Sequence, residues 1–150
     1  MKLSNLVNSE LIFLDIDHQN KDSAIESIID KLCETDKTLN NSTIVDLIQK
    51  REKLCSTALD NYVAIPHTKI PGISRTRACL GICQEGVDFG SIDELKTKIL
   101  ILILHPENTD NHHLDILRSV ATIFAKKNVV SEILSLNDKN LIYQIIQTNE

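Results

Sequence analysis

The longest apolar run of the chain, Ile99 to Leu104, alternates Ile and Leu without a polar residue. A helix that crosses a bilayer needs about 20 apolar residues, so this run is far too short to span a membrane. It fits a central β-strand that is buried on both faces, because a strand with one solvated face carries polar residues at every second position. A strand of this kind lies in a sheet covered by helices, which predicts an α/β structure.

Other short segments also favour β-branched or aliphatic residues and are bounded by Pro and Gly. They are Tyr62 to Ile65, Ala78 to Cys83, the slightly longer run Lys98 to Leu104 and, near the amino end, Leu11 to Ile16. This composition predicts strands, while the pattern alone leaves their order in the sheet open.

Helical periodicity occupies both ends of the chain. The spacing of apolar residues predicts helices over Asp22 to Glu34, Thr43 to Lys53, His113 to Ala125, Val129 to Leu136 and Lys139 to Gln147. Asn41 or Ser42 is the expected N-cap of the second helix. In the third helix the predicted buried face consists of Leu114, Leu117, Val120, Ala121 and Phe124.

The length, the net charge and the amino end of the chain indicate its domain number, its kind of partner and its location. With 150 residues, 42% of them hydrophobic, the chain is expected to form a single domain over residues 1–150. The net charge of −5 and the scattered Lys and Arg residues predict no binding to nucleic acid. The amino end lacks the apolar core of a signal peptide, so we expect a cytoplasmic protein that does not insert into a membrane.

The four cysteines, Cys33, Cys55, Cys79 and Cys83, are irregularly spaced and are interpreted as ordinary free thiols. Cys79 and Cys83 lie in a predicted strand, where a separation of four residues places side chains roughly 13 Å apart, too far for one zinc ion. No familiar Cys/His ligand spacing occurs, so the sequence predicts neither a metal site nor a cofactor.

The segment Arg51 to Gly72 carries the clearest sign of chemistry. Pro66 and His67 follow an apolar strand, and this order is expected to present the imidazole of His67 from a fixed backbone position into a loop. By itself a single loop histidine is more often a solvated or hydrogen-bonded side chain than a functional group.

Three pieces of this segment together resemble the active-site signature of the fructose/mannitol-type IIA proteins of the bacterial phosphoenolpyruvate-dependent sugar phosphotransferase system. These are Arg51-Glu52, Ser56-Thr57 and Val63-Ala64-Ile65-Pro66-His67. Further likeness comes from Gln84 to Gly90, from His113-Leu114 and from Leu141 to Ile146. Because no IIB domain or membrane segment accompanies the domain, the chain is most similar to the nitrogen-regulatory branch of the family.

The resemblance implies a mixed central sheet of about five strands with helices on both sides. It also implies a phosphotransferase component with a phosphohistidine intermediate. His67 is the expected phosphoryl acceptor, His113 a second active-site histidine, Arg51 a group that stabilises the phosphoryl oxygens and Thr57 a candidate hydroxyl donor. The implied partners are a histidine phosphocarrier similar to HPr or NPr and, downstream, a IIB protein or a regulated target.

The chain departs from the family pattern next to the histidine. Ala58 to Tyr62 stand where relatives have a loop with glycines, and Thr68 stands where they have a small residue. The carboxylate of Asp60 would oppose a phosphoryl group unless it points into solvent or pairs with Lys69. A regulatory binding module that no longer accepts phosphate is therefore the alternative hypothesis. A metal-dependent enzyme using His67, His112, His113 and the cysteines fits the sequence poorly.

Overall fold

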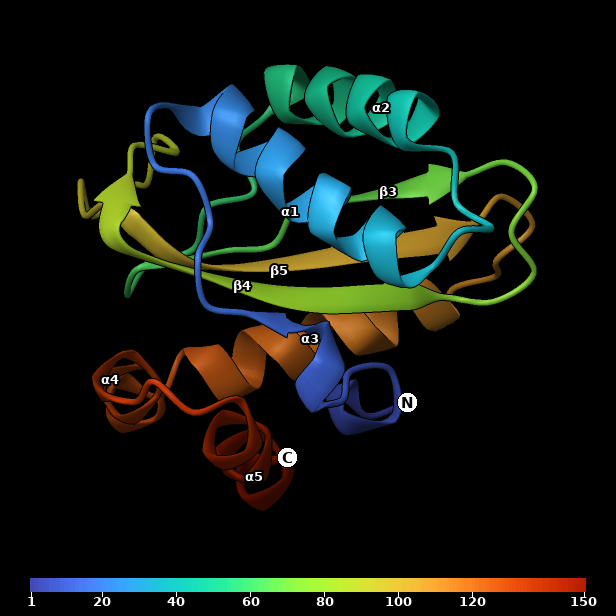
Figure 1. Cartoon of the computed structure of the whole chain (residues 1–150). Coiled ribbons are helices and arrows are strands. Elements are labelled where there is room, and N and C mark those ends of the chain that lie inside the picture. Colours follow the sequence, from blue (N-terminus) through green and yellow to red (C-terminus); the bar gives the residue numbers. More distant parts are fainter.

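The computed structural model describes all residues 1–150 as a mixed five-stranded sheet between two helical layers (Figure 1). The strands are β1 (Ile12–Phe13), β2 (Val63–Ala64), β3 (His67–Ile70), β4 (Arg77–Val87) and β5 (Thr97–Pro106). Their order is β1-β4-β5-β2, and β3 also pairs with β5. Only β4 and β5 are antiparallel, while the other pairs are parallel. The predicted mixed sheet flanked by helices is confirmed.

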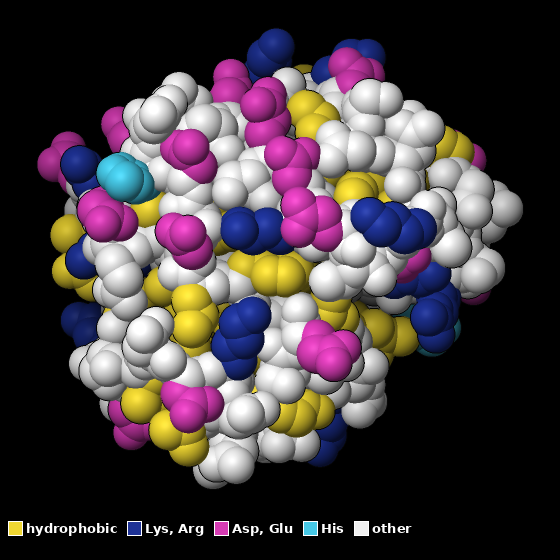
Figure 2. All heavy atoms as spheres, viewed as in Figure 1, with side chains coloured by type: hydrophobic (Ala, Val, Ile, Leu, Met, Phe, Trp, Pro, Cys, Tyr) yellow, Lys and Arg dark blue, Asp and Glu magenta, His cyan; other side chains and the backbone are white.

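One helical layer contains α1 (Lys21–Thr35) and α2 (Asn41–Leu54). The opposite layer contains α3 (His112–Phe124), α4 (Lys127–Ser135) and α5 (Lys139–Asn149), together with two short 3-10 turns, Leu3–Asn5 and Ser9–Leu11 (Figure 1). None of these helices combines the length and apolarity needed to cross a bilayer. On the face shown in Figure 2, basic and acidic side chains are interspersed.

The sheet divides the apolar interior into two clusters, and β5 contributes to both. Ile99, Ile101 and Ile103 face the cluster on the side of α3, α4 and α5, while Leu100, Leu102 and Leu104 face the cluster under α1 and α2. All six side chains are fully buried. The prediction that this run forms a central strand covered on both faces is therefore confirmed.

The helices begin close to where the sequence places them, with one correction at a cap. Asn40, and not Asn41 or Ser42, caps α2, because its side chain accepts a hydrogen bond from the backbone N–H of Thr43. In α3 the buried face consists of Ile116, Val120, Ile123 and Phe124. Leu114, predicted to lie on that face, remains 45% exposed.

Two strands differ from the sequence prediction. β1 spans only Ile12–Phe13, although the backbone of Ile16 still donates to the carbonyl of Ile82. His67 does not lie in a loop but opens β3, because the chain stays beside β5 across Pro66, whose carbonyl accepts the N–H of Ile103. Pro66 has no N–H of its own, so the strand pattern is interrupted there without the chain leaving the sheet.

Candidate functional site

The site forms where the end of α2 meets the first residue of β3. After α2 the chain turns back on itself: the N–H of Ile65 donates to the carbonyl of Thr57 at 3.1 Å, and the N–H of Leu59 donates to that of Val63 at 2.7 Å. Residues 57–59 thus lie antiparallel to residues 63–65. This hairpin brings the last turn of α2, Thr57 and His67 into one region.

Glu52 anchors this hairpin to α2. The residue is only 6% exposed, and its carboxylate accepts hydrogen bonds from both the backbone N–H, at 3.1 Å, and the hydroxyl group of Thr57. Lys21 of α1 forms an ion pair with the same carboxylate at 2.8 Å. A buried carboxylate of this kind needs such partners, because burial of an unpaired charge is costly. The hydroxyl proton of Thr57 is therefore directed to Glu52.

His67 is half-buried, and its ring is held by one short hydrogen bond. Its Nδ1 lies 2.7 Å from the carbonyl oxygen of Ile65. A carbonyl can only accept, so Nδ1 carries the proton and the lone pair of the neutral ring is on Nε2. Burial lowers the pKa of His67 from 6.5, and the positive charge of Arg51 and the nearby His113 lower it further. The ring is therefore neutral at pH 7, with the Nε2 lone pair available.

Arg51 also belongs to the last turn of α2. One of its terminal nitrogens donates to the carbonyl of Cys55 at 3.0 Å, which holds the guanidinium across the end of the helix. Its other N–H groups have no acceptor within the protein. A planar guanidinium with free donors can bind two oxygens of a phosphoryl group at once.

His113 occupies the first turn of α3, and its Nδ1 lies 2.7 Å from the carbonyl oxygen of Asp110. By the same reasoning its Nδ1 is the donor and its Nε2 is open. The neighbouring His112 points away, with its side chain 82% exposed and 3.9 Å from the carboxylate of Asp115. The two adjacent histidines thus face different directions.

A third histidine near the site, His105, was not predicted from the sequence. It belongs to β5 and is only 1% exposed, with its ring centroid 5.4 Å from that of His113 in an edge-on arrangement. Burial, with smaller contributions from His113, His67 and Lys69, lowers its pKa to about 4. Its Nε2 has no hydrogen-bond partner within the protein. His105 directly follows the apolar run Ile99 to Leu104, and this position was the feature of the sequence that could have marked it as a buried polar residue.

The loop that lacks the family's glycines still adopts left-handed backbone conformations. Asn61 has φ of 71° and Tyr62 has φ of 70°, in the region that glycine occupies without strain. The N–H of Asn61 is fixed by the carboxylate of Asp93 at 2.9 Å. Asp60 is exposed and forms no ion pair with Lys69, so its carboxylate lies in solvent.

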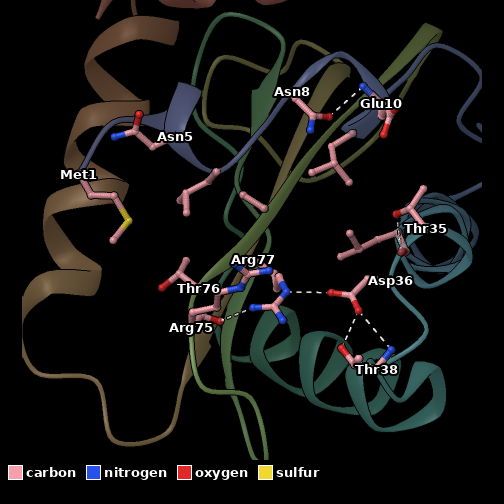
Figure 3. Close-up of a pocket in the computed structure, with 14 residues that line it drawn as sticks. Met1, Asn5, Asn8, Glu10, Thr35, Asp36, Thr38, Arg75, Thr76 and Arg77 are labelled. Carbon is pink, nitrogen blue, oxygen red and sulfur yellow. Dashed lines mark hydrogen bonds and ion pairs between the residues drawn. The ribbon is translucent and has the colours of Figure 1, made fainter.

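A cavity of about 810 Å³ lies elsewhere, between the amino-terminal segment, the end of α1 and the start of β4 (Figure 3). In its wall Arg77 donates to the carboxylate of Asp36 at 2.8 Å and to the carbonyl of Arg75 at 3.1 Å. None of Arg51, His67 and His113 lines it. Arg51, His67 and His113 thus lie apart from this cavity.

Comparison with protein families identifies the family to which the chain belongs. Residues 5–149 match the family described as "Phosphoenolpyruvate-dependent sugar phosphotransferase system, EIIA 2". Because the match covers nearly the whole chain, the protein belongs to this family. The resemblance noted in the sequence is therefore confirmed.

Two curated relatives represent the two branches of the family. The chain is 29% identical to a nitrogen regulatory protein of Klebsiella oxytoca, over 97% of this chain and 90% of the relative. It is 25% identical to the fructose-specific EIIABC component of Bacillus subtilis strain 168, over 100% of this chain. The chain spans only 24% of the length of that larger protein.

Solved structures share the fold. The nitrogen regulatory protein IIA-Ntr from Neisseria meningitidis aligns with a TM-score of 0.85 at 23% identity, covering 96% of this chain and 98% of that one. The enzyme IIAMTL in a complex with phosphorylated enzyme IIBMTL from Escherichia coli aligns with a TM-score of 0.77 at 20% identity, covering 95% and 97%. At these identities the likeness establishes the fold.

Proposed function

We propose that this protein is a phosphoryl carrier that accepts a phosphoryl group on Nε2 of His67. The observation that carries the proposal is the hydrogen bond from Nδ1 of His67 to the carbonyl of Ile65, which leaves the Nε2 lone pair of a neutral ring open beside Arg51. Family membership supports the same chemistry. The whole chain then acts as one IIA domain in the cytoplasm.

In the transfer step, the bonds that form and break join phosphorus to the ring of His67 and to the ring of the donor's phosphohistidine. The Nε2 lone pair of His67 attacks phosphorus while the P–N bond of the donor's phosphohistidine breaks and its electron pair returns to the donor's ring. The ring of His67 becomes positively charged as the new bond forms. The carbonyl of Ile65 and the carboxylate of Glu52 favour that charge, since both raise the pKa of His67.

Arg51 and His113 compensate the negative charge of the phosphoryl oxygens. Arg51 supplies fixed positive charge and N–H donors. His113 has its Nδ1 proton committed to Asp110, so it can donate from Nε2 only after taking up a proton.

Thr57 acts indirectly in this proposal. The sequence pointed to it as a hydroxyl donor to the phosphoryl group, but its proton is directed to Glu52. We infer that Thr57 positions Glu52 and the hairpin, and does not contact the phosphoryl oxygens.

We further propose that the donor is a histidine phosphocarrier similar to HPr or NPr and that the recipient is a IIB protein or a regulated target. Leu54 at the end of α2 and Leu114 beside His113 are 83% and 45% exposed, and such apolar side chains suit a protein partner. Among proteins of this fold, IIAMTL forms a complex with phosphorylated IIBMTL. The nitrogen-regulatory relatives favour a regulated target.

Intact-mass measurement after incubation with phosphoenolpyruvate, enzyme I and a cognate phosphocarrier tests the proposal. We expect one acid-labile phosphoryl group on the wild type and none on His67→Ala. His112→Ala is the matched control and should behave as wild type, because its side chain points away from the site. Arg51→Ala should slow transfer by roughly 10²- to 10³-fold, as expected for losing a preorganised electrostatic contact. No transfer to the wild type from an active carrier would favour the binding module that has lost phosphorylation.

A further inference from the structure

A second group of chemically reactive side chains lies near the carboxyl end of β4. His18, Cys83 and Glu85 each offer one possible ligand atom, and these atoms all lie within 4.8 Å of one another. Nδ1 of His18 and a carboxylate oxygen of Glu85 are 3.7 Å apart. None of the three residues has a part in the proposed phosphoryl transfer.

The fold assembles this group from two segments distant in sequence. Cys83 and Glu85 are two residues apart on β4, so they share one face of the strand. The pairing of β4 with β5 is irregular between Ile82 and Val87, and Gly86 has φ of 81°. A bulge of this kind re-aims side chains. His18 comes from the segment that continues β1 alongside β4.

The loop carrying His18 is fixed before any ligand binds. The carboxylate of Asp17 accepts the N–H of Gln19 at 2.9 Å and the hydroxyl of Ser23 at 3.0 Å, and the N–H of Asp17 donates to Ser27 of α1 at 3.2 Å. The backbone of His18 is therefore tied to α1 on both sides.

We propose that His18, Cys83 and Glu85 form a binding site for a divalent metal ion, with Zn²⁺ as the best match. Imidazole, thiolate and carboxylate are its usual ligands, and tetrahedral coordination requires ligand atoms roughly 3.3–3.6 Å apart. The buried Cys83 supplies a fixed position, while the exposed His18 and Glu85 move by the small remaining distance. On binding, the S–H bond of Cys83 breaks, its proton goes to solvent and a metal–sulfur bond forms. Water completes the coordination.

The site has a structural consequence that is independent of His67. An ion held by all three residues would join the loop before α1 to the end of β4, and a ligand that binds only the folded state raises its stability. Sequence spacing does not reveal such a site, because His18 and Cys83 are far apart in the chain.

Titration of the full chain with Zn²⁺, and with Co²⁺ as a spectroscopic probe, tests the proposal. We expect one ion per chain and a thiolate-to-cobalt charge-transfer band. The band should disappear in Cys83→Ser. Zn²⁺ affinity should fall roughly 10- to 100-fold or more in His18→Ala and in Glu85→Gln, since losing a ligand costs at least as much as losing a residue that orients one. Both of these side chains are exposed, so these two variants keep the fold even if Cys83→Ser does not.

Two control variants locate the ion. Cys55→Ser removes an exposed thiol elsewhere, and His113→Ala removes a histidine of the phosphoryl site. Both should bind Zn²⁺ as the wild type does. Absence of stoichiometric binding, absence of the cobalt charge-transfer band in the wild type, or affinity unchanged by both His18→Ala and Glu85→Gln would each overturn the proposal. The phosphoryl transfer to His67 would be unaffected by any of these results.

Discussion

At the scale of single residues, the three histidines near the site differ in how their ring nitrogens are held. His67 and His113 each use Nδ1 to donate to a backbone carbonyl at 2.7 Å, which leaves Nε2 open. His105 lies within the sheet with only a long contact, 3.5 Å, from Nδ1 to the hydroxyl of Thr76. Two rings thus keep Nε2 open, and the third is a buried neutral group beside them.

The burial of His105 predicts a loss of stability in mild acid. Its pKa is about 4 in the folded protein and 6.5 as an unperturbed side chain, so between these values the unfolded chain binds more protons. The stabilising effect of a neutral His105 is therefore fully present above pH 6.5 and declines as the pH falls toward 4. Urea unfolding at a series of pH values measures this decline.

The variant His105→Leu provides the comparison, because it cannot be protonated. We expect its free energy of unfolding to depend less on pH between 6.5 and 4 than that of the wild type. Asp17, Asp36 and Asp93 have pKa values below 3.8, mainly because of hydrogen bonds, so their contributions are lost at lower pH. If the free energy of unfolding changed equally with pH in the wild type and the variant, His105 would not be a buried titrating group.

At the scale of elements, the last turn of α2 and the hairpin that follows act as one unit through Glu52. We expect Glu52→Gln to lower the free energy of unfolding by about 1.5 to 3 kcal/mol, because it weakens hydrogen bonds and an ion pair made to a charged acceptor. The variant should also slow phosphoryl transfer, since Thr57 and the hairpin lose their anchor. Urea unfolding and the mass assay measure the two effects.

Asp46→Asn is the matched control on the same helix. Asp46 pairs with Lys50 at 3.0 Å, but the side chains are 60% and 69% exposed. Removing such a surface pair should cost less than about 0.5 kcal/mol. If Glu52→Gln were as mild as this control, Glu52 would not organise the site.

Helices and strands with a strong apolar pattern were predictable from the sequence. A strand that forms only because it pairs with a neighbouring strand was not. The helices and β5 follow directly from periodicity and from the run Ile99 to Leu104. β3 was missed because only Ile70 of its four residues is buried, so no apolar alternation marks it. Its strand conformation depends on pairing with β5.

At the scale of the whole molecule, the two apolar clusters share β4 and β5 and should unfold together. Ile101 and Leu102 are neighbours on β5 but belong to different clusters. We expect Ile101→Ala and Leu102→Ala each to cost about 2 to 5 kcal/mol, as for large-to-small changes in a core. Both variants should keep a single urea transition, and the dependence of their free energy of unfolding on urea concentration should be unchanged. Two separate transitions in either variant would show that the layers are independent.

The candidate site was predictable only where residues are close along the chain or belong to the family signature. Arg51, Thr57 and His67 were proposed in this way, and the hairpin between Thr57 and Ile65 explains their proximity. His113 was proposed from its likeness to the family alone. The positions of His105 beside His113 and of His18 beside Cys83 depend on strand register and loop packing. No local pattern encodes such contacts.

The central claim is that Nε2 of His67 receives the phosphoryl group. Phosphorus and nitrogen NMR of the phosphorylated protein, with heavy-nitrogen-labelled histidine, tests it most directly. We predict one phosphorus atom coupled to Nε2 of a single ring that still carries its Nδ1 proton, and no such signal in His67→Ala. Phosphorus bound to Nδ1, phosphorus on another histidine, or no phosphohistidine in the presence of an active carrier would contradict the account.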